Sequence, residues 1–305
     1  MSSPDIRSIG TFRTVIGEGP LWSSRDQALY WVDTVQKKIL RHRPATGAVA
    51  NGAVAMGAVE TRDLHFRPSC LALLPDGRFV IVFKKGLAYL DFETGAWEAI
   101  PTQTDINFDI TLFNDGKVDR AGRLWIGTMD KVADTAAGGL YRVDPDFKVT
   151  RHAHKVLVSN GMAWSPDGRT MYHADSRPGC VYAMDFDATS GTLSNRRPFI
   201  DYRGKEGRPD GCTIDAEGHL WVAEVEAAKV SRYAPDGRLV REIRLPVKKP
   251  TSVMFGGADL ATLYVTSMTF RLSEAELAEQ PCAGTLLAID AGVRGLPEPV
   301  FGQGA

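Results

Sequence analysis

The sequence lacks an excess of charge of either sign, a long apolar run and an N-terminal targeting pattern. Its 305 residues carry 36 basic and 37 acidic side chains, so we expect no nucleic-acid partner. No stretch approaches the ~18 apolar residues of a membrane-spanning helix, so we expect no membrane partner. The opening residues, MSSPDIRSIG, show no basic head followed by an apolar run, and no secretory signal is predicted. These absences predict a cytoplasmic protein.

Cysteine is also scarce. Cys70, Cys180, Cys212 and Cys282 lie far apart, and none forms a C-x-x-C pair. A disulfide framework or a structural zinc site is therefore not predicted. We expect four free thiols that are buried or half-buried.

Contiguous catalytic motifs are missing as well. The sequence contains no Walker loop and no G-x-S-x-G elbow. The segment GEGPLW, which starts at Gly17, begins like a dinucleotide fingerprint but lacks the third glycine. The sequence therefore offers no contiguous motif that identifies a site.

What the sequence does contain is a repeat. A polar turn followed by a short strand with an aromatic residue occurs six times, and successive copies are 49, 46, 47, 49 and 43 residues apart. The six aligned aromatic residues are Tyr30, Phe79, Trp125, Tyr172, Trp221 and Tyr264. A second strand-and-turn pattern, as in GLAYLDFETG and GLYRVDPDFK, lies between the copies. Periods of about 40–50 residues without helical patterning are typical of propeller blades.

We therefore predict an all-β protein, a six-bladed β-propeller that forms a single domain over residues 1–305. The one helix signal is LSEAELAEQ near the end, where Ser273 and Glu276 match a capping box. In a propeller the innermost strands line a central channel, so a site is expected as isolated polar residues, one from each of several blades.

Four such residues stand out. Glu18, Asn114, Asn160 and Asp210 each lie within two residues of a glycine and 11 or 12 positions ahead of a repeat aromatic residue. The constant offset predicts that all four face the same end of the channel. Carboxylate and amide oxygens suit one divalent cation, Ca²⁺ first, with Zn²⁺, Mg²⁺ or Mn²⁺ as alternatives. The competing interpretation is that these segments are ordinary turns with no ligand.

Four segments together resemble the SMP-30/gluconolactonase/LRE-like family: GEGP, FNDGKVDRAGRLWIGTM, SNGMAWSPDGRTMYHADS and PDGCTIDAEGHLWVAE. The resemblance covers nearly the whole chain and implies a six-bladed propeller. It also implies one divalent cation held by the positions that match Glu18, Asn160 and Asp210. Asn114 matches a residue that contacts the substrate or the metal, and Asp210 matches the proposed general base.

The activity implied by the resemblance is that of a metal-dependent lactonase. Such an enzyme hydrolyses a sugar-derived (aldono-) or related small lactone to the hydroxy acid, in carbohydrate metabolism. The cation acts as a Lewis acid on the lactone carbonyl, and Asp210 takes the proton of the attacking water. The alternatives are a metal-dependent phosphotriesterase-like hydrolase and a calcium-binding propeller without turnover. We expect a monomer whose partner is the small-molecule lactone.

One departure from the family bears on the substrate. Many sugar lactonases of this family carry an arginine two residues before the asparagine of the FNDG segment, where this sequence has Leu112. One interpretation is a less polar pocket mouth with Phe113 and its aromatic neighbours, and a less hydroxylated substrate. The other is that Arg62 or Arg67 supplies the guanidinium.

Three further expectations concern the same region. Leu112, Phe113 and Asp130 are candidates for substrate contact beside Asn114. For Asp130 the alternative is an ordinary surface role. The segment from residue 60 to 68 is expected to form a loop that covers the channel.

Overall fold

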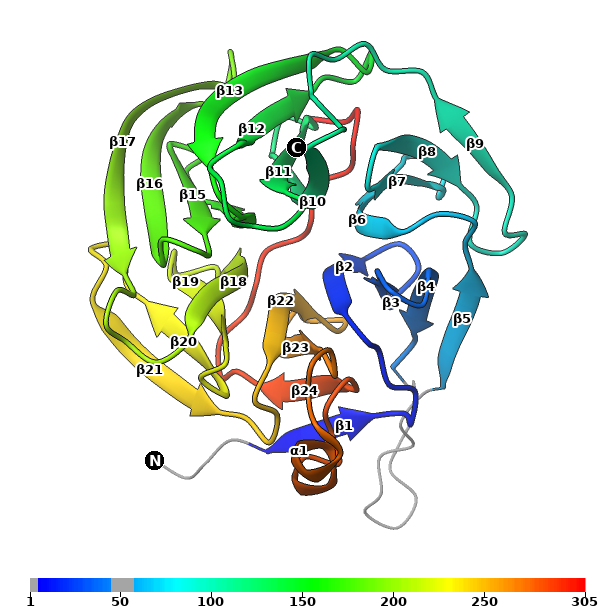
Figure 1. The fold of residues 1–305 in the computed structure, drawn as a ribbon, viewed down its shortest axis with the longest axis vertical. Coiled ribbons are helices and arrows are strands. Elements are labelled where there is room, and N and C mark those ends of the chain that lie inside the picture. The colour runs from blue at the N-terminus through cyan, green and yellow to red at the C-terminus, as the bar shows by residue number, and fades with distance from the viewer. Residues whose placement is uncertain (1–4, 45–57, 305) are drawn as a thin grey trace.

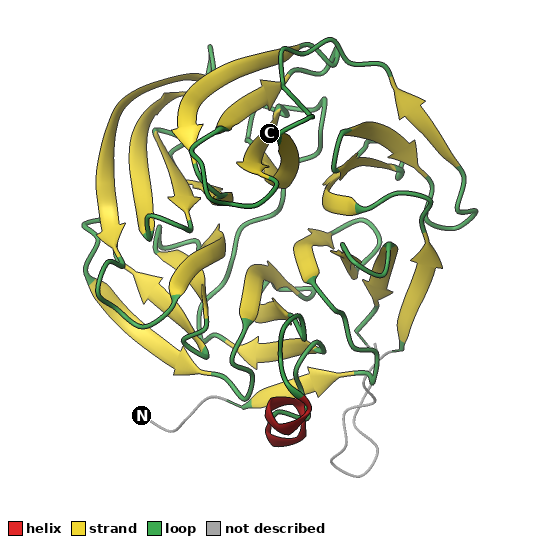
Figure 2. Ribbon diagram, in the orientation of Figure 1, coloured by secondary structure: helices red, strands yellow, loops and turns green. Residues whose placement is uncertain are grey.

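The computed structural model describes residues 5–44 and 58–304, and six four-stranded antiparallel sheets surround a central axis (Figure 1). Strands and loops make up almost all of the described chain, with one short helix at the rim (Figure 2). The predicted all-β, six-bladed propeller is confirmed.

Each of the first three blades runs outward from the axis in chain order. The first comprises β2 (Gly17–Ser23), β3 (Ala28–Asp33), β4 (Lys38–His42) and β5 (Val59–Asp63). The second comprises β6 (Pro68–Leu73), β7 (Phe79–Phe83), β8 (Gly86–Leu90) and β9 (Trp97–Ile100). The third comprises β10 (Thr111–Val118), β11 (Leu124–Asp130), β12 (Gly138–Val143) and β13 (Val149–Val156).

The next two blades repeat this plan, and the last one departs from it. The fourth comprises β14 (Ser159–Trp164), β15 (Thr170–Asp175), β16 (Cys180–Asp187) and β17 (Thr192–Asp201). The fifth comprises β18 (Arg208–Ile214), β19 (Leu220–Val225), β20 (Lys229–Tyr233) and β21 (Leu239–Arg244). The sixth comprises β22 (Pro250–Gly256), β23 (Thr262–Ser267), β24 (Leu286–Asp290) and, outermost, β1 (Ile6–Ile9).

The sixth blade closes the ring, because its outer strand comes from the other end of the chain. β1 pairs antiparallel with β24, with Ile6 opposite Ile289 and Ile9 opposite Leu286. Ser8 Oγ donates a hydrogen bond to Thr285 Oγ1 across the same pair at 2.8 Å. The two ends of the chain are thus joined in one sheet, which leaves no unpaired break in the ring.

The repeat aromatic residues all occupy the second strand of their blades and are buried. Trp125 and Trp221 are fully buried, and each indole Nε1 donates to the aspartate six residues earlier, Asp119 (2.9 Å) and Asp215 (2.8 Å). The polar turn of the repeat therefore anchors the strand that follows it, because the turn supplies an acceptor for a buried donor. Apolar side chains fill the space between neighbouring blades.

Each innermost strand carries a β-bulge at the same level. The register shifts occur between Glu18 and Leu21, and at the corresponding places in the other five blades: Pro68/Cys70, Phe113/Gly116, Asn160/Met162, Pro209/Cys212 and Pro250/Ser252. A bulge interrupts the alternation of a strand and redirects a side chain. The four residues singled out in the sequence all lie at or beside these bulges.

The C-terminal segment closes one end of the central channel. After β24 the chain crosses the ring (Figure 1), where Phe301 N donates to Leu73 O at 2.8 Å and Glu298 lies 3.6 Å from Lys117 Nζ. Leu73 is the last residue of β6, so the segment lies at the end of the channel opposite the starts of the innermost strands. The remaining end, where those strands begin, is the one that can admit a ligand.

The structure corrects one local expectation and confirms two others. The loop expected over residues 60–68 is shorter, because Val59–Asp63 is β5, the outermost strand of its blade, and only residues 64–67 form the connection to β6. The helix α1 (Glu274–Glu279) begins after Ser273 with the predicted capping box. The four cysteines are free thiols, and all but Cys282 are buried. Within the described residues, no helix is long and apolar enough to cross a membrane.

Candidate active site

The site lies at the open end of the channel, where the innermost strands begin. Glu18 in β2, Asn114 in β10 and Asn160 in β14 line a cavity of about 410 Å³. Asp210 in β18 is buried, 6% exposed, and lies close enough to Glu18 for the two carboxylates to interact electrostatically. The structure therefore brings together the four residues that the sequence singled out at a common offset.

A chain of hydrogen bonds orients the two amides. Asn114 Nδ2 donates to Asn160 Oδ1 at 2.8 Å and to the carbonyl oxygen of Ser159 at 3.0 Å. Asn160 Nδ2 donates to Ser176 Oγ at 2.9 Å, and this hydroxyl donates to the carbonyl oxygen of Pro209 at 2.7 Å. The bond to Ser176 fixes the orientation of the Asn160 amide, and its oxygen, which accepts only from Asn114, keeps a second lone pair for a further ligand.

Two of the glycines that follow site residues allow the innermost strands to approach one another. A Cβ at Gly161 would lie 2.4 Å from the carbonyl oxygen of Asp210, and the backbone there has φ +41°. A Cβ at Gly211 would lie 1.9 Å from Ser252 Oγ. Only glycine fits at such separations, so the Asn-Gly and Asp-Gly pairs hold β14, β18 and β22 close together.

Carboxylates are concentrated at the floor of the cavity. Burial raises the pKa of Glu18 to about 8, with a further contribution from the nearby Asp115 carboxylate. Burial, Glu18 and Asp115 together raise the pKa of Asp210 well above its ordinary value. Burial also raises the pKa of Asp115. The backbone N–H of Gly116, which donates to the Asp115 carboxylate at 2.8 Å, lowers that pKa but only in part offsets burial. Three buried carboxylates so close together need protons or a cation.

The residues present fit a divalent cation. Asp210 Oδ1 is buried and, among the described residues, has no hydrogen-bond partner. A buried carboxylate oxygen without a donor is costly unless a ligand satisfies it. Glu18, Asn160 and Asp210 together offer hard oxygen ligands of the kind that Ca²⁺ and Mg²⁺ prefer. In the described part of the chain, no cluster of three or more His, Cys, Asp or Glu side chains forms a metal site, so this mixed carboxylate and amide set is the candidate.

Asp115 is a member of the site that the sequence reasoning missed. It lines the cavity and contributes to the raised pKa values of both Glu18 and Asp210. It directly follows Asn114, and the bulge between Phe113 and Gly116 interrupts the alternation of β10. Without a bulge, neighbouring strand residues face opposite sides, so sequence periodicity alone does not place Asp115 beside Asn114 at the axis.

The predicted substrate contacts are divided by the structure. Leu112 lines the cavity. Phe113 is buried, 1% exposed, and packs against Phe108 at a centroid distance of 5.2 Å, so its ring belongs to the core. Asp130 lies outside the cavity lining, and its carboxylate accepts hydrogen bonds from Val132 N at 2.8 Å and from the Thr135 hydroxyl. Asp130 therefore holds the loop after β11.

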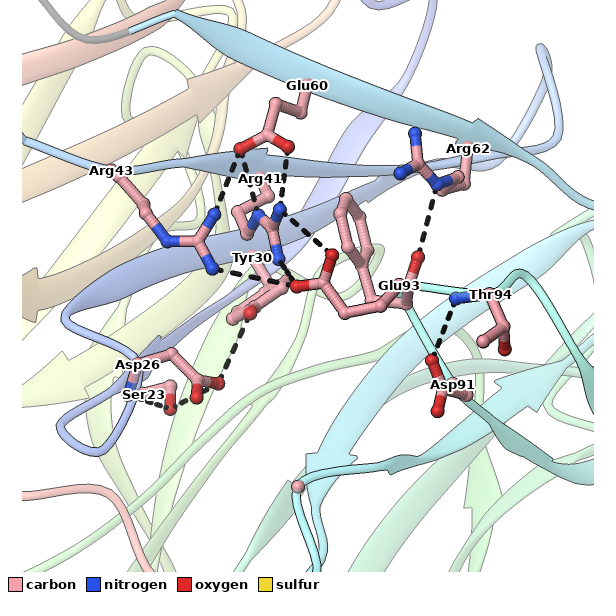
Figure 3. A network of polar contacts seen from close by, with 12 residues as sticks. Ser23, Asp26, Tyr30, Arg41, Arg43, Glu60, Arg62, Asp91, Glu93 and Thr94 are labelled. Atoms are coloured by element: carbon pink, nitrogen blue, oxygen red, sulfur yellow. Dashed lines mark hydrogen bonds and ion pairs between the residues drawn. The ribbon is translucent and has the colours of Figure 1, made fainter.

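The two candidate arginines are also separated. Arg62 Nε donates to the carbonyl oxygen of Phe92 at 3.1 Å, within the polar network that joins the first two blades around Arg41 (Figure 3). Arg67, by contrast, lines the cavity together with Leu112. The structure thus favours Arg67 as the source of a guanidinium. Phe66 packs against Phe83 and Trp97 and does not line the cavity.

Basic side chains are the second feature that the sequence reasoning missed. Besides Arg67, the cavity is lined by Lys84, Lys131, Arg177 and Arg271. Burial lowers the pKa of Lys84 to about 8, partly offset by the Glu18 carboxylate. Four of the five lie five to seven residues after a repeat aromatic residue, in the turn that follows the second strand of a blade. That offset is the signal that could have identified them.

Comparison with known proteins identifies a family and several relatives. The family described as "SMP-30/Gluconolactonase/LRE-like region" matches residues 16–269. A 6-deoxy-6-sulfogluconolactonase of Pseudomonas putida is 38% identical over 94% of this chain and 95% of its own. Regucalcin of Gallus gallus is 36% identical over 99% of both chains. A crystal structure of a calcium-binding protein, regucalcin, from Agrobacterium tumefaciens has a TM-score of 0.89 and 28% identity, with 99% of both chains covered.

Proposed function

Because the chain belongs to the SMP-30/gluconolactonase/LRE-like family, we propose that it is a metal-dependent lactonase. Its reaction is hydrolysis of a sugar-derived or related small lactone to the hydroxy acid. The observation that carries the proposal is the buried, unpartnered Asp210 Oδ1, whose carboxylate interacts with Glu18 next to a cavity that Glu18 and Asn160 line. This arrangement supplies both a ligand set for a cation and a proton acceptor.

The chain's own residues account for most of the proposed chemistry. When bound, a dication held by Glu18, Asn160 and Asp210 supplies Lewis acidity at the lactone carbonyl. Asp210 accepts a proton from the attacking water as the water oxygen bonds to the carbonyl carbon. The ring C–O bond then breaks, and the proton passes to the ring oxygen, which becomes the hydroxyl of the product. We assign to Asn114, whose amide nitrogen donates to Ser159 O and to Asn160 Oδ1, the role of orienting the lactone.

A second candidate function is calcium binding without turnover. It is favoured by one observation, the likeness to the calcium-binding regucalcin of Agrobacterium tumefaciens. The same three ligands would serve both functions, so cation binding does not distinguish them. Hydrolysis of a lactone does distinguish them.

The test is hydrolysis of a lactone panel after chelation and after restoring Ca²⁺, Zn²⁺, Mg²⁺ or Mn²⁺ one at a time. We expect chelation to abolish hydrolysis and at least one dication to restore it. Asp210→Asn should reduce kcat by about 10²–10⁴-fold, the contribution typical of a general base, with an unchanged circular dichroism spectrum. Asp236→Asn, in an exposed turn of the fifth blade, is the matched control and should keep full activity. Cation binding without hydrolysis of any lactone would establish the second candidate.

Location and assembly belong to the same proposal. We propose a cytoplasmic monomer, in keeping with four free thiols, which suit a reducing compartment. Mass measurement in solution tests the oligomeric state directly.

A further inference from the structure

Basic side chains dominate the wall of the cavity. Of the eighteen residues that line it, five are lysine or arginine and two are carboxylates. In the whole chain 36 of 305 residues are basic, so the lining holds more than twice its share of positive charge. The two lining carboxylates, Glu18 and Asp115, are at the floor, within the candidate cation site.

These five residues come together because of the blade geometry. Lys84, Lys131, Arg177 and Arg271 lie in the connections between the second and third strands of four different blades, and Arg67 directly precedes β6. In an antiparallel blade the end of the second strand and the start of the first lie at the same edge. The basic side chains are therefore placed at the same end of the channel as Glu18 and Asn160.

Within the described part of the protein, none of the five forms an ion pair with a carboxylate. Lys84 interacts with the Glu18 carboxylate electrostatically, and its Nζ donates to the carbonyl oxygen of Phe113 at 3.4 Å. Lys131 Nζ donates to a carbonyl oxygen, that of Asp109, at 2.5 Å. The Arg271 guanidinium lies over the exposed Phe270 ring, 5.2 Å from its centroid, beside the cavity.

The fifth blade provides a contrast. Its corresponding connection carries Glu226, which lies 3.3 Å from Lys249 Nζ and 3.8 Å from Lys248 Nζ. There an ion pair supplies the counter-charge. No such pair is formed by the basic side chains of the cavity, whose two lining carboxylates, Glu18 and Asp115, lie among the crowded carboxylates that need a cation. Cationic groups gathered in a cleft repel one another, so an anionic ligand would be attracted to them.

We propose that the lactone accepted by this site carries a negatively charged group, a sulfonate, phosphate or carboxylate, which Arg67, Arg177 and Arg271 bind at the mouth of the cavity. The inference rests on the proposed lactonase function and names its substrate class. Guanidinium groups bind such oxyanions through paired hydrogen bonds. Leu112 fits this assignment, because the guanidinium donors for the substrate then come from these three arginines and not from β10.

The first experiment compares kcat/KM for a neutral lactone and its anionic counterparts. D-glucono-1,5-lactone is the neutral reference, and its 6-phosphate, its 6-deoxy-6-sulfonate and D-saccharic acid 1,4-lactone carry the three kinds of anion. We expect at least one anionic lactone to exceed the neutral one by at least about tenfold in kcat/KM. Its advantage should fall between 0.02 and 0.5 M salt, because salt screens attraction between charges.

The second experiment tests the named residues. Arg177→Gln and Arg67→Gln should each lower kcat/KM for the preferred anionic lactone by about 10–100-fold, through KM, the loss expected for one charge-assisted contact. The loss for the neutral lactone should be at least tenfold smaller. Arg177→Lys should retain part of the activity, since it keeps the charge but loses the paired geometry. Arg238→Gln, at an exposed turn between β20 and β21, is the matched control.

The outcomes separate the two proposals. Hydrolysis of the neutral and anionic lactones with equal kcat/KM, unaffected by salt and by the arginine substitutions, would overturn the charge assignment and leave the lactonase function standing. Hydrolysis of no lactone with any dication would overturn the lactonase function. In that case, competition of the 6-phosphate and sulfonate acids against a fluorescent anion still tests whether the three arginines bind anions. Binding that is lost in Arg177→Gln supports the charge assignment, and the absence of binding refutes it.

Discussion

Replacing Glu18 by glutamine should make the cation-free protein more stable than the cation-free wild type. In the presence of the cation, the variant should be less stable than the wild type. Glutamine keeps the size of the side chain and an acceptor for Gly19 N, which now donates to Glu18 Oε2 at 3.3 Å. It removes one of three crowded carboxylates. Burial and Asp115 raise the pKa of Glu18 from 4.5 to about 8.

The sign follows from that direction. A carboxyl group with a raised pKa contributes stability below its unfolded pKa, and this stability is lost as pH rises toward the folded value. At pH 7 the loss in the chelated wild type is about 3 kcal/mol, and at pH 5 it is under about 1 kcal/mol. Glu18→Gln removes this loss, which corresponds to a rise in Tm of roughly 6 °C at pH 7.

Differential scanning calorimetry in chelator at pH 5 and pH 7 measures the effect, and a second series contains saturating Ca²⁺. The wild type should gain stability with Ca²⁺ by mass action, whereas the variant should gain little. Glu98→Gln, an exposed carboxylate in β9, is the control and should behave as the wild type. The reasoning is refuted if Glu18→Gln lowers Tm equally at both pH values in chelator, or if Ca²⁺ stabilises both proteins alike.

Two further predictions concern the scaffold. Burial lowers the pKa of His173 to about 3, so this group contributes stability above about pH 6.5 that is lost as pH falls toward 3. Between pH 7 and pH 5, the free energy of unfolding should therefore fall by about 2 kcal/mol less in His173→Gln than in the wild type. Calorimetric stabilities that fall in parallel with pH in the two proteins would contradict this. Asp215→Ala should cost about 3–5 kcal/mol, because Arg232 Nε and Trp221 Nε1, both 2.8 Å away, lose a buried acceptor. Asp236→Ala, in the exposed turn of the same blade, is the control and should change stability by less than about 0.5 kcal/mol. If Asp215→Ala destabilises the protein no more than Asp236→Ala does, the buried network is unimportant.

The repeat made the architecture predictable. Tyr30, Trp125 and Tyr172 recur at nearly equal spacing because each occupies the buried second strand of a blade. The near-constant offset of Glu18 and Asp210 from these aromatics reflects the bulge that every innermost strand carries. Local patterns of this kind report packing within one blade, which is the same in all six.

Features that depend on contacts between blades or on surface strands were not predictable. β5 has the sequence Val-Glu-Thr-Arg-Asp, whose polar residues resemble a loop because an outermost strand has little to bury. β1 completes the last blade through Ser8 and Thr285, which are 277 residues apart in the sequence. Asp115 enters the site because a bulge breaks the alternation of β10, and sequence periodicity assumes that alternation.

The position of the cation is the most direct test of the whole account. Crystals grown without chelator and soaked in Mn²⁺ should be measured at a wavelength where manganese scatters anomalously. The account predicts one anomalous peak at the channel floor, about 2.0–2.6 Å from oxygens of Glu18, Asn160 and Asp210. A peak elsewhere, or no peak among these three side chains at saturating Mn²⁺, Ca²⁺ or Zn²⁺, would contradict it.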